Sequence, residues 1–214
     1  AVTAGPPMAY GRTHLNATLL ADGRVFVNGG NDGTNFDDSS SVYRSEIWDP
    51  KANAWTLGAT AQVPRNYHST ALLLPDGTVW TAGGGGCGEG CTVNHLNYEI
   101  YYPPYLFKKD GSGNYAPRPT LTSAPAGLAY GQGFSLGTPQ AASVQRVTLI
   151  ALSATTHAFN MNQRFLELPI TDRGAGTLQV TTPANPNLAP PGFYLLFILD
   201  KRGVPSVGEI VQLE

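Results

Sequence analysis

Two short segments carry side chains that could bind a metal ion. Tyr67 and His68 stand side by side in RNYHS, and His157 lies in the polar stretch TTHAFNMNQ between apolar runs. A phenol oxygen and an imidazole nitrogen on adjacent residues reach one ion only where the chain bends, because neighbours in a regular strand point to opposite faces. The preceding Pro64 favours a bend, and the surroundings of His157 predict a loop tip, where functional residues concentrate.

Each segment also has a structural alternative. An isolated histidine is more often a hydrogen-bonded structural residue than a ligand, and the threonines and asparagines around His157 could simply turn a hairpin. We expect the other two histidines, His14 and His95, to be structural, although His95 could also support a site without touching its ligand. No glutamate lies near either segment to act as a base, which disfavours a zinc hydrolase.

An internal repeat organises the first half of the chain and places Tyr67 and His68. Residues 11–50 align with residues 64–103, with a period of 53 or 54 residues between repeated pairs such as Glu46-Ile47 and Glu99-Ile100, or Asp22-Gly23 and Asp76-Gly77. Each copy contains an apolar run, an Asp-Gly turn, a second apolar run that ends in Gly-Gly, and a third run. Short strands in a unit of about 50 residues are typical of a kelch-type β-propeller blade.

The repeat predicts two such blades, and two blades cannot form a closed propeller. A propeller has about four to eight blades, and each blade needs neighbours to bury both of its faces. We therefore expect a partner that completes the propeller, either an N-terminal portion of the same protein or a companion chain. Tyr67 and His68 precede the first strand of the second blade, at the end that lies near the central channel of a propeller.

The second half of the chain has a different pattern. Apolar segments separated by Pro, Gly and Asn predict an antiparallel β-sandwich, and the last two strands are joined by a turn at Asp200 to Gly203. The sequence thus predicts an all-β protein with three parts. Residues 1–106 form the two blades of an incomplete propeller, residues 107–117 form a linker, and residues 118–214 form the sandwich.

Composition excludes several classes of protein. The 25 glycines and 17 prolines among 214 residues exclude a helical bundle. The 13 basic residues against 15 acidic ones offer no net attraction to the phosphates of a nucleic acid. No apolar run approaches the length of about 18 residues that a membrane-spanning helix needs.

The two cysteines lie close together. Cys87 and Cys91 are separated by three residues in GGGGCGEGC, which favours a local disulfide over half of a metal-binding knuckle, since no second pair of cysteines exists. A disulfide favours an oxidising compartment, so we expect a secreted, extracellular protein, or one of the periplasm or cell envelope.

The motifs together resemble the galactose oxidase and glyoxal oxidase family of copper radical oxidases. The resemblance rests on three motifs in this order, YHSTALLLPDGTVWTAGGGGCGEGCTVNH, THAFNMNQR and PGFYLLFILDKRGVPSVGEI, and it covers essentially the whole chain. It implies that the two predicted blades are the last two of a propeller. It also implies that the sandwich is the immunoglobulin-like (E-set) domain of that family.

The resemblance implies one copper ion held by Tyr67, His68 and His157. Tyr67 matches the axial tyrosine, which takes the substrate proton and is therefore the expected catalytic residue. His68 and His157 match the two imidazole ligands, a donor set that suits Cu(II). Phe36 matches an aromatic residue of the substrate pocket, and the cysteine pair matches a structural disulfide.

The resemblance also implies a reaction that this chain cannot complete by itself. The family oxidises a primary alcohol or an aldehyde with O2 and releases H2O2. Its radical cofactor is a tyrosine cross-linked to a cysteine, and both residues would lie upstream of the present sequence, so the cross-link has no candidate here. The alternative function is a non-catalytic module that binds a glycan or a protein through the predicted blades and sandwich.

Overall fold

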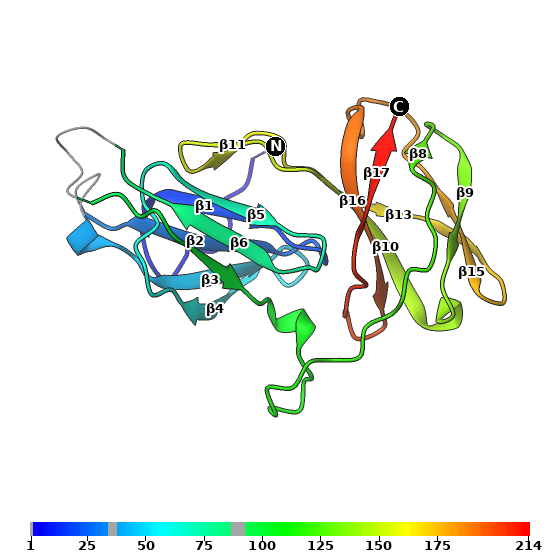
Figure 1. The fold of residues 1–214 in the computed structure, drawn as a ribbon, viewed down its shortest axis with the longest axis horizontal. Coiled ribbons are helices and arrows are strands. Elements are labelled where there is room, and N and C mark those ends of the chain that lie inside the picture. The colour runs from blue at the N-terminus through cyan, green and yellow to red at the C-terminus, as the bar shows by residue number, and fades with distance from the viewer. Residues whose placement is uncertain (1, 34–37, 87–92) are drawn as a thin grey trace. The chain divides into compact units, whose positions relative to one another are not determined.

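The computed structural model of the protein describes residues 2–33, 38–86 and 93–214 (Figure 1). Almost all of its regular structure is β-strand, interrupted by the short 3-10 helices η1 (Asp38–Ser40), η3 (Pro104–Leu106) and η4 (Ala141–Ser143). None of the helices in the described ranges has the length and apolar character needed to span a membrane.

The chain divides into two compact units, and both contain segments that are distant in sequence. The first unit comprises Ala1–Leu73, Val79–Tyr101 and Ser153–Asn162. The second unit comprises Leu74–Thr78, Tyr102–Leu152 and Gln163–Glu214. The segment with His157 therefore belongs to the same unit as Tyr67 and His68.

The first unit contains a four-stranded and a three-stranded antiparallel sheet, and in both the strands follow one another in chain order. The four-stranded sheet consists of β1 (Thr13–Leu19), β2 (Val25–Asn31), β3 (Arg44–Asp49) and β4 (Ala54–Thr60). The three-stranded sheet consists of β5 (Ser69–Leu73), β6 (Val79–Gly83) and β7 (Tyr98–Tyr101). The predicted Asp-Gly hairpins are confirmed, because the amide of Gly23 donates to the Leu20 carbonyl and that of Gly77 to the Leu74 carbonyl, both at 2.9 Å.

A buried ion pair holds the start of the four-stranded sheet to its middle. Arg12 Nη2 lies 2.7 Å from Glu46 Oε1, and neither side chain is exposed. Glu46 also accepts the backbone N–H groups of Ala9 and Tyr10, and Arg12 donates to the Gly29 carbonyl. Burial lowers the pKa of Arg12, but the carboxylate of Glu46 opposes that shift, so the guanidinium stays charged.

The three-stranded sheet repeats this arrangement with Arg65 and Glu99. The Arg65 side chain is buried, donates to the Gly83 carbonyl at 2.9 Å and to the Asn97 carbonyl at 3.2 Å, and pairs with Glu99 at 3.4 Å. Burial lowers the pKa of Arg65, and the negative charge of Glu99 acts in the opposite direction. The Arg65 carbonyl accepts the N–H of Gly30 at 2.8 Å. One arginine thus connects both sheets directly before the Tyr67–His68 segment.

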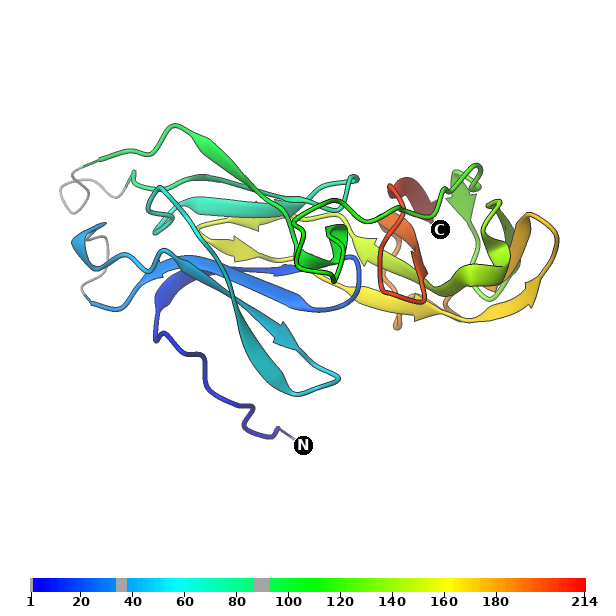
Figure 2. The ribbon, with the colours of Figure 1, turned by 90° about the horizontal axis from the view of Figure 1, so that it is seen from below.

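A short hairpin from the second half of the chain completes the first unit. Strands β11 (Thr155–Thr156) and β12 (Phe159–Asn160) form it, with β12 against β1 and β11 against β5. Figure 2 shows this yellow hairpin running between the strands of the two sheets. The hydroxyl of Thr70 in β5 donates to that of Thr155 at 2.7 Å, which fixes the hairpin next to the second sheet.

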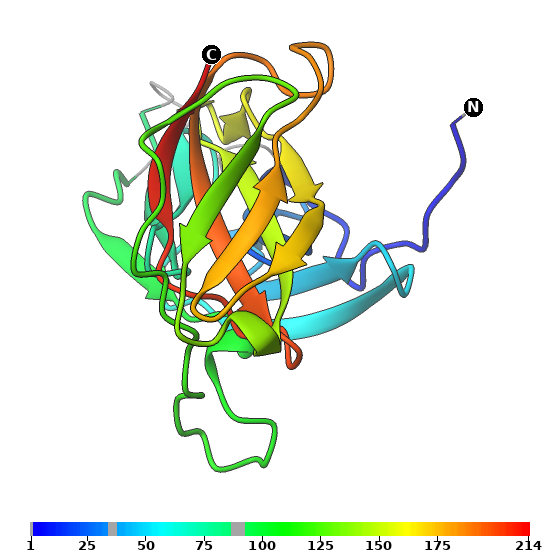
Figure 3. The same cartoon turned by 90° about the vertical axis from the view of Figure 1, so that its right-hand side faces the viewer.

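The second unit is a sandwich of two sheets, and Figure 3 looks onto the face of the smaller one. The larger sheet has the order β13 (Phe165–Leu168), β10 (Val144–Ala151), β16 (Gly192–Asp200), β17 (Glu209–Leu213), β8 (Gly127–Leu128). The smaller sheet has the order β14 (Ile170–Arg173), β15 (Thr177–Thr181), β9 (Gly133–Gly137). All pairs are antiparallel except β17 with β8.

The sandwich core comes from alternate residues that face inward from both sheets. Leu149 on β10 and Leu196 on β16 are fully buried from the larger sheet, as are Leu136 on β9 and Leu178 on β15 from the smaller one. On β15 and β17 buried residues alternate with more exposed ones, as a strand with one face on a core requires, whereas β10 and β16 are buried on both faces. The predicted linker, residues 107–117, forms a small hairpin of its own in which the rings of Phe107 and Tyr115 stack at 5.2 Å.

We predict that Glu46→Gln lowers the free energy of unfolding by about 3 kcal/mol, because it leaves the buried guanidinium of Arg12 without its counter-charge. Urea denaturation measures the effect. The same substitution at exposed Glu209 is the control and should change stability by less than about 0.5 kcal/mol. Equal losses in the two variants would show that the ion pair is not needed.

Candidate metal centre

Three aromatic side chains with metal-binding atoms meet in the first unit. The ring centroids of Tyr67 and His68 are 3.9 Å apart, and those of His68 and His157 are 4.5 Å apart. Tyr67 and His157 close the triangle at 5.7 Å. The structure therefore brings together the three predicted ligand residues, from two segments that are distant in the sequence. Tyr67 is half-buried, whereas His68 and His157 are exposed.

A bend in the backbone puts Tyr67 and His68 on one side of the chain. His68 has a left-handed φ of 62°, and the N–H of Ser69 donates back to the Asn66 carbonyl at 3.0 Å. This turn ends directly before β5 begins, so the two side chains do not alternate as they would within a strand. The turn is what allows both rings to face the same point.

His157 occupies a position that its residue type does not favour. His157 and Ala158 are the two central residues of the β11–β12 hairpin, with φ values of 54° and 60°. Two consecutive left-handed residues define a type I′ turn, which Asn-Gly normally fills. A histidine and an alanine are strained there, and strain of this kind concentrates at functional sites. The turn aims the imidazole at Tyr67 and His68.

The other side of His68 is held by a glycine-rich segment. His68 Nδ1 lies 2.9 Å from the Gly85 carbonyl. Because a carbonyl only accepts, Nδ1 must carry the hydrogen, and the lone pair of Nε2 is left to bind a metal ion. The N–H of Gly85 donates to the Tyr67 carbonyl at 2.8 Å. A Cβ on Gly86 would lie 3.0 Å from His68 Nδ1, so the close approach of this segment requires glycine.

The remaining predicted residues fall in two groups. His14, which we expected to be structural, lies edge-on to the Tyr67 ring, with the ring centroids 5.4 Å apart. Its position beside the three predicted ligands was not predicted from the sequence. The signal was available, since His14 follows Arg12 as His68 follows Arg65 in the repeat. Phe36 and the cysteine pair Cys87 and Cys91 lie outside the described residues.

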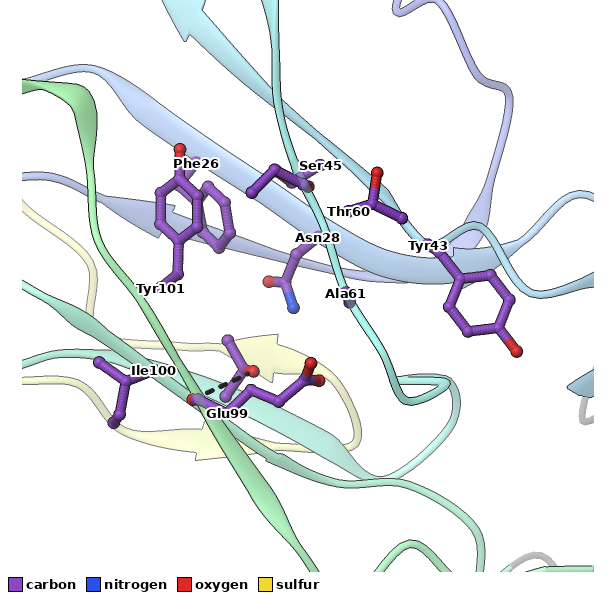
Figure 4. Close-up of a pocket in the computed structure, with 11 residues that line it drawn as sticks. Phe26, Asn28, Tyr43, Ser45, Thr60, Ala61, Glu99, Ile100 and Tyr101 are labelled. Atoms are coloured by element: carbon purple, nitrogen blue, oxygen red, sulfur yellow. Dashed lines mark hydrogen bonds between the residues drawn. The ribbon is translucent and has the colours of Figure 1, made fainter. Parts of the chain in front are cut away.

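A cavity of about 100 Å³ in the same unit is separate from this cluster (Figure 4). Residues of both sheets line it, among them Asn28, Glu99 and Tyr101, but none of the three predicted ligands does. Tyr101 stacks on Phe26 at 4.0 Å, and burial raises the pKa of Tyr101 to about 12. The phenol therefore stays neutral near pH 7, as expected of a structural residue between two sheets.

Known proteins resemble this chain along nearly its whole length. Residues 118–213 match the family described as galactose oxidase-like, early set domain. The chain is 34% identical to galactose oxidase of Gibberella zeae over 99% of its own length and 31% of that protein. It is 31% identical to aldehyde oxidase GLOX of Vitis pseudoreticulata over 96% of its length and 42% of that protein.

A solved structure shows the same fold. A fungal alcohol oxidase of the AA5 family, in complex with copper, superposes with a TM-score of 0.88 at 35% identity. The match covers 98% of the present chain and 44% of the other. The chain thus spans less than half the length of these relatives.

We predict that Gly86→Ala weakens Cu(II) binding about 10-fold, because the added Cβ pushes against the nitrogen that orients His68. Isothermal titration with Cu(II) measures the affinity. Gly111→Ala is the matched control, since Gly111 has a similar left-handed φ of 75° but nothing within 4 Å of a Cβ. Equal affinities for both variants and the wild type would contradict the role of this close approach.

Proposed function

We propose that the chain is the C-terminal part of a mononuclear copper radical oxidase, because it is similar along nearly its whole length to galactose oxidase, aldehyde oxidase GLOX and a copper-binding fungal alcohol oxidase. The proposed substrate is a primary alcohol or an aldehyde. For an alcohol, the balanced reaction is RCH2OH + O2 → RCHO + H2O2. The observation that carries the proposal is the convergence of Tyr67, His68 and His157 on one point.

The donor set fits copper. Two imidazole nitrogens and a phenol oxygen are the nitrogen and oxygen ligands that suit Cu(II), and the hydrogen bond of His68 to Gly85 leaves its Nε2 available. His157 Nδ1 lies 2.6 Å from the hydroxyl of Thr156, a contact that limits the rotation of its ring. When bound, copper would polarise the substrate oxygen and accept one electron.

Tyr67 is the residue we assign to proton transfer. Its oxygen, as a phenolate, would accept the hydroxyl proton of the substrate and become a neutral phenol, which requires hydrogen-bond reach and a fixed ring. Three neighbouring rings restrict the ring of Tyr67, namely those of His14, His68 and His157. A base held in this way loses little orientational freedom when substrate binds.

The rest of the reaction needs residues that precede the present sequence. Removing two electrons from an alcohol takes a second one-electron acceptor, which we assign to a cross-linked tyrosine and cysteine of an upstream segment. We propose that β1–β4 and β5–β7 are kelch blades within residues 1–106, that 107–117 link them to the sandwich of 118–214, and that an N-terminal portion or a companion chain completes the propeller. The proposed location is extracellular, with Cys87 and Cys91 joined in a disulfide.

We predict copper-dependent H2O2 formation from alcohols or aldehydes when the chain is produced together with its upstream residues. Tyr67→Phe should still bind copper through the two imidazoles, with lower affinity, and should lower kcat at saturating copper by about 10²- to 10⁴-fold, because the proton acceptor is lost. His157→Ala should lose copper affinity as well. Tyr115→Phe, at an exposed tyrosine of the second unit, is the control and should retain full activity.

A peroxide assay across a panel of alcohols and aldehydes, with copper measured in each variant, makes the test. Absence of copper-dependent peroxide from every compound would overturn the oxidase function. An upstream sequence that lacks the cysteine or the tyrosine would overturn the proposed radical step. The better proposal would then be a non-catalytic module that binds a glycan or a protein.

A further inference from the structure

A hydrogen-bonded network connects the Tyr67–His68 turn to two side chains that are not among the proposed ligands, Asp38 and His95. We propose that Asp38 and His95 form a positioning pair that holds the Tyr67–His68 turn in the geometry needed for a metal ligand. This inference rests on the proposed function, because the geometry matters only if the turn binds copper. Neither Asp38 nor His95 lies among the three ligand residues.

The Asp38 carboxylate uses its two oxygens for different partners. Oδ1 accepts the side-chain amide of Asn66 at 2.9 Å, and Oδ2 lies 2.8 Å from His95 Nε2. The Asn66 amide also donates to the Ser41 hydroxyl at 2.8 Å, and Asn66 is only 3% exposed. Asn66 directly precedes Tyr67. The hydrogen bond from Asn66 to Asp38 therefore fixes the residue next to a proposed ligand, and it is the first route from Asp38 to the turn.

The second route passes through His95 and the glycine-rich segment. The backbone N–H of His95 donates to the Gly84 carbonyl at 2.9 Å, and the side chain of Asn94 accepts the N–H of Gly86 at 2.7 Å. Gly85, between these two anchored glycines, makes the bonds to the Tyr67 carbonyl and to His68 Nδ1. His95 and its neighbour therefore hold the segment that in turn orients His68.

The segment needs such support because of its composition. Gly84, Gly85 and Gly86 all have left-handed φ values, of 120°, 107° and 68°. Glycine adopts these conformations easily but also leaves them easily, so bonds from outside must select one. Because a carboxylate only accepts, His95 Nε2 is the donor toward Asp38, and the bond is charge-assisted.

The pair is testable through copper affinity. We expect Asp38→Ala and His95→Ala each to weaken Cu(II) binding by about 10- to 100-fold, the range found when groups that orient metal ligands are removed. His95→Gln should restore most of the affinity, because the glutamine amide can donate to Asp38. Asp32→Ala, an exposed aspartate on the same loop, is the matched control and should bind copper as the wild type does.

The copper spectrum separates positioning from general stability. Electron paramagnetic resonance of bound Cu(II) should change in Asp38→Ala and His95→Ala, since the orientation of His68 changes, and it should not change in Asp32→Ala. The double variant should bind Cu(II) at most about threefold more weakly than either single variant, because both substitutions act through the same contacts. Wild-type affinity and an unchanged spectrum in both single variants would overturn the inference.

A measurement on the metal-free protein keeps this test independent of the proposed function. Hydrogen–deuterium exchange of the peptide containing residues 84–86 should be faster in Asp38→Ala than in Asp32→Ala, because the amide of Gly85 loses the support of its bond to Tyr67. If the wild-type protein binds no copper, the proposed function fails while this comparison still decides the positioning. Equal exchange in the two variants would overturn the inference in either case.

Discussion

The buried guanidinium of Arg65 connects the parts on which the candidate metal centre depends. The guanidinium donates to the carbonyl of Gly83 at the end of β6 and to that of Asn97 directly before β7, and it pairs with Glu99. The backbone carbonyl of Arg65 accepts the N–H of Gly30 in β2. The next three residues form the turn that presents Tyr67 and His68. Because a buried cation without its hydrogen-bond and charge partners is strongly destabilising, the ion pair and the turn stabilise each other.

The two sheets of the first unit repeat one design but differ where chemistry is expected. Arg12 and Glu46 make the more buried ion pair, with neither side chain exposed, while Glu99 remains partly exposed. A left-handed histidine lies at the start of each sheet: His14 is the second residue of β1, and His68 directly precedes β5. Arg12 and His14 are separated by one residue, whereas Arg65 and His68 are separated by two. The second copy therefore has one more residue before its histidine, and Tyr67 occupies the position next to it. The strained backbone is thus concentrated at the candidate site.

The sequence predicts the elements of this structure better than their contacts. Periodic apolar runs and the Asp-Gly turns, such as Asp22-Gly23, predict the hairpins because these signals are local. The meeting of His157 with Tyr67 is tertiary and followed only from the family resemblance. A supporting role for His95 is one of the two roles expected from the sequence, but its partner Asp38 and the bond of Asp38 to Asn66 had no signal there, because the spacing of these residues follows no strand or helix period.

We propose that Tyr67, His68 and His157 bind one copper ion. A crystal structure of the protein with its upstream residues, with diffraction data collected at the copper absorption edge, is the direct test. We expect one anomalous peak in contact with Nε2 of His68, an imidazole nitrogen of His157 and the oxygen of Tyr67. A copper peak bound elsewhere, or a copper-saturated protein without a peak at these three residues, would contradict it.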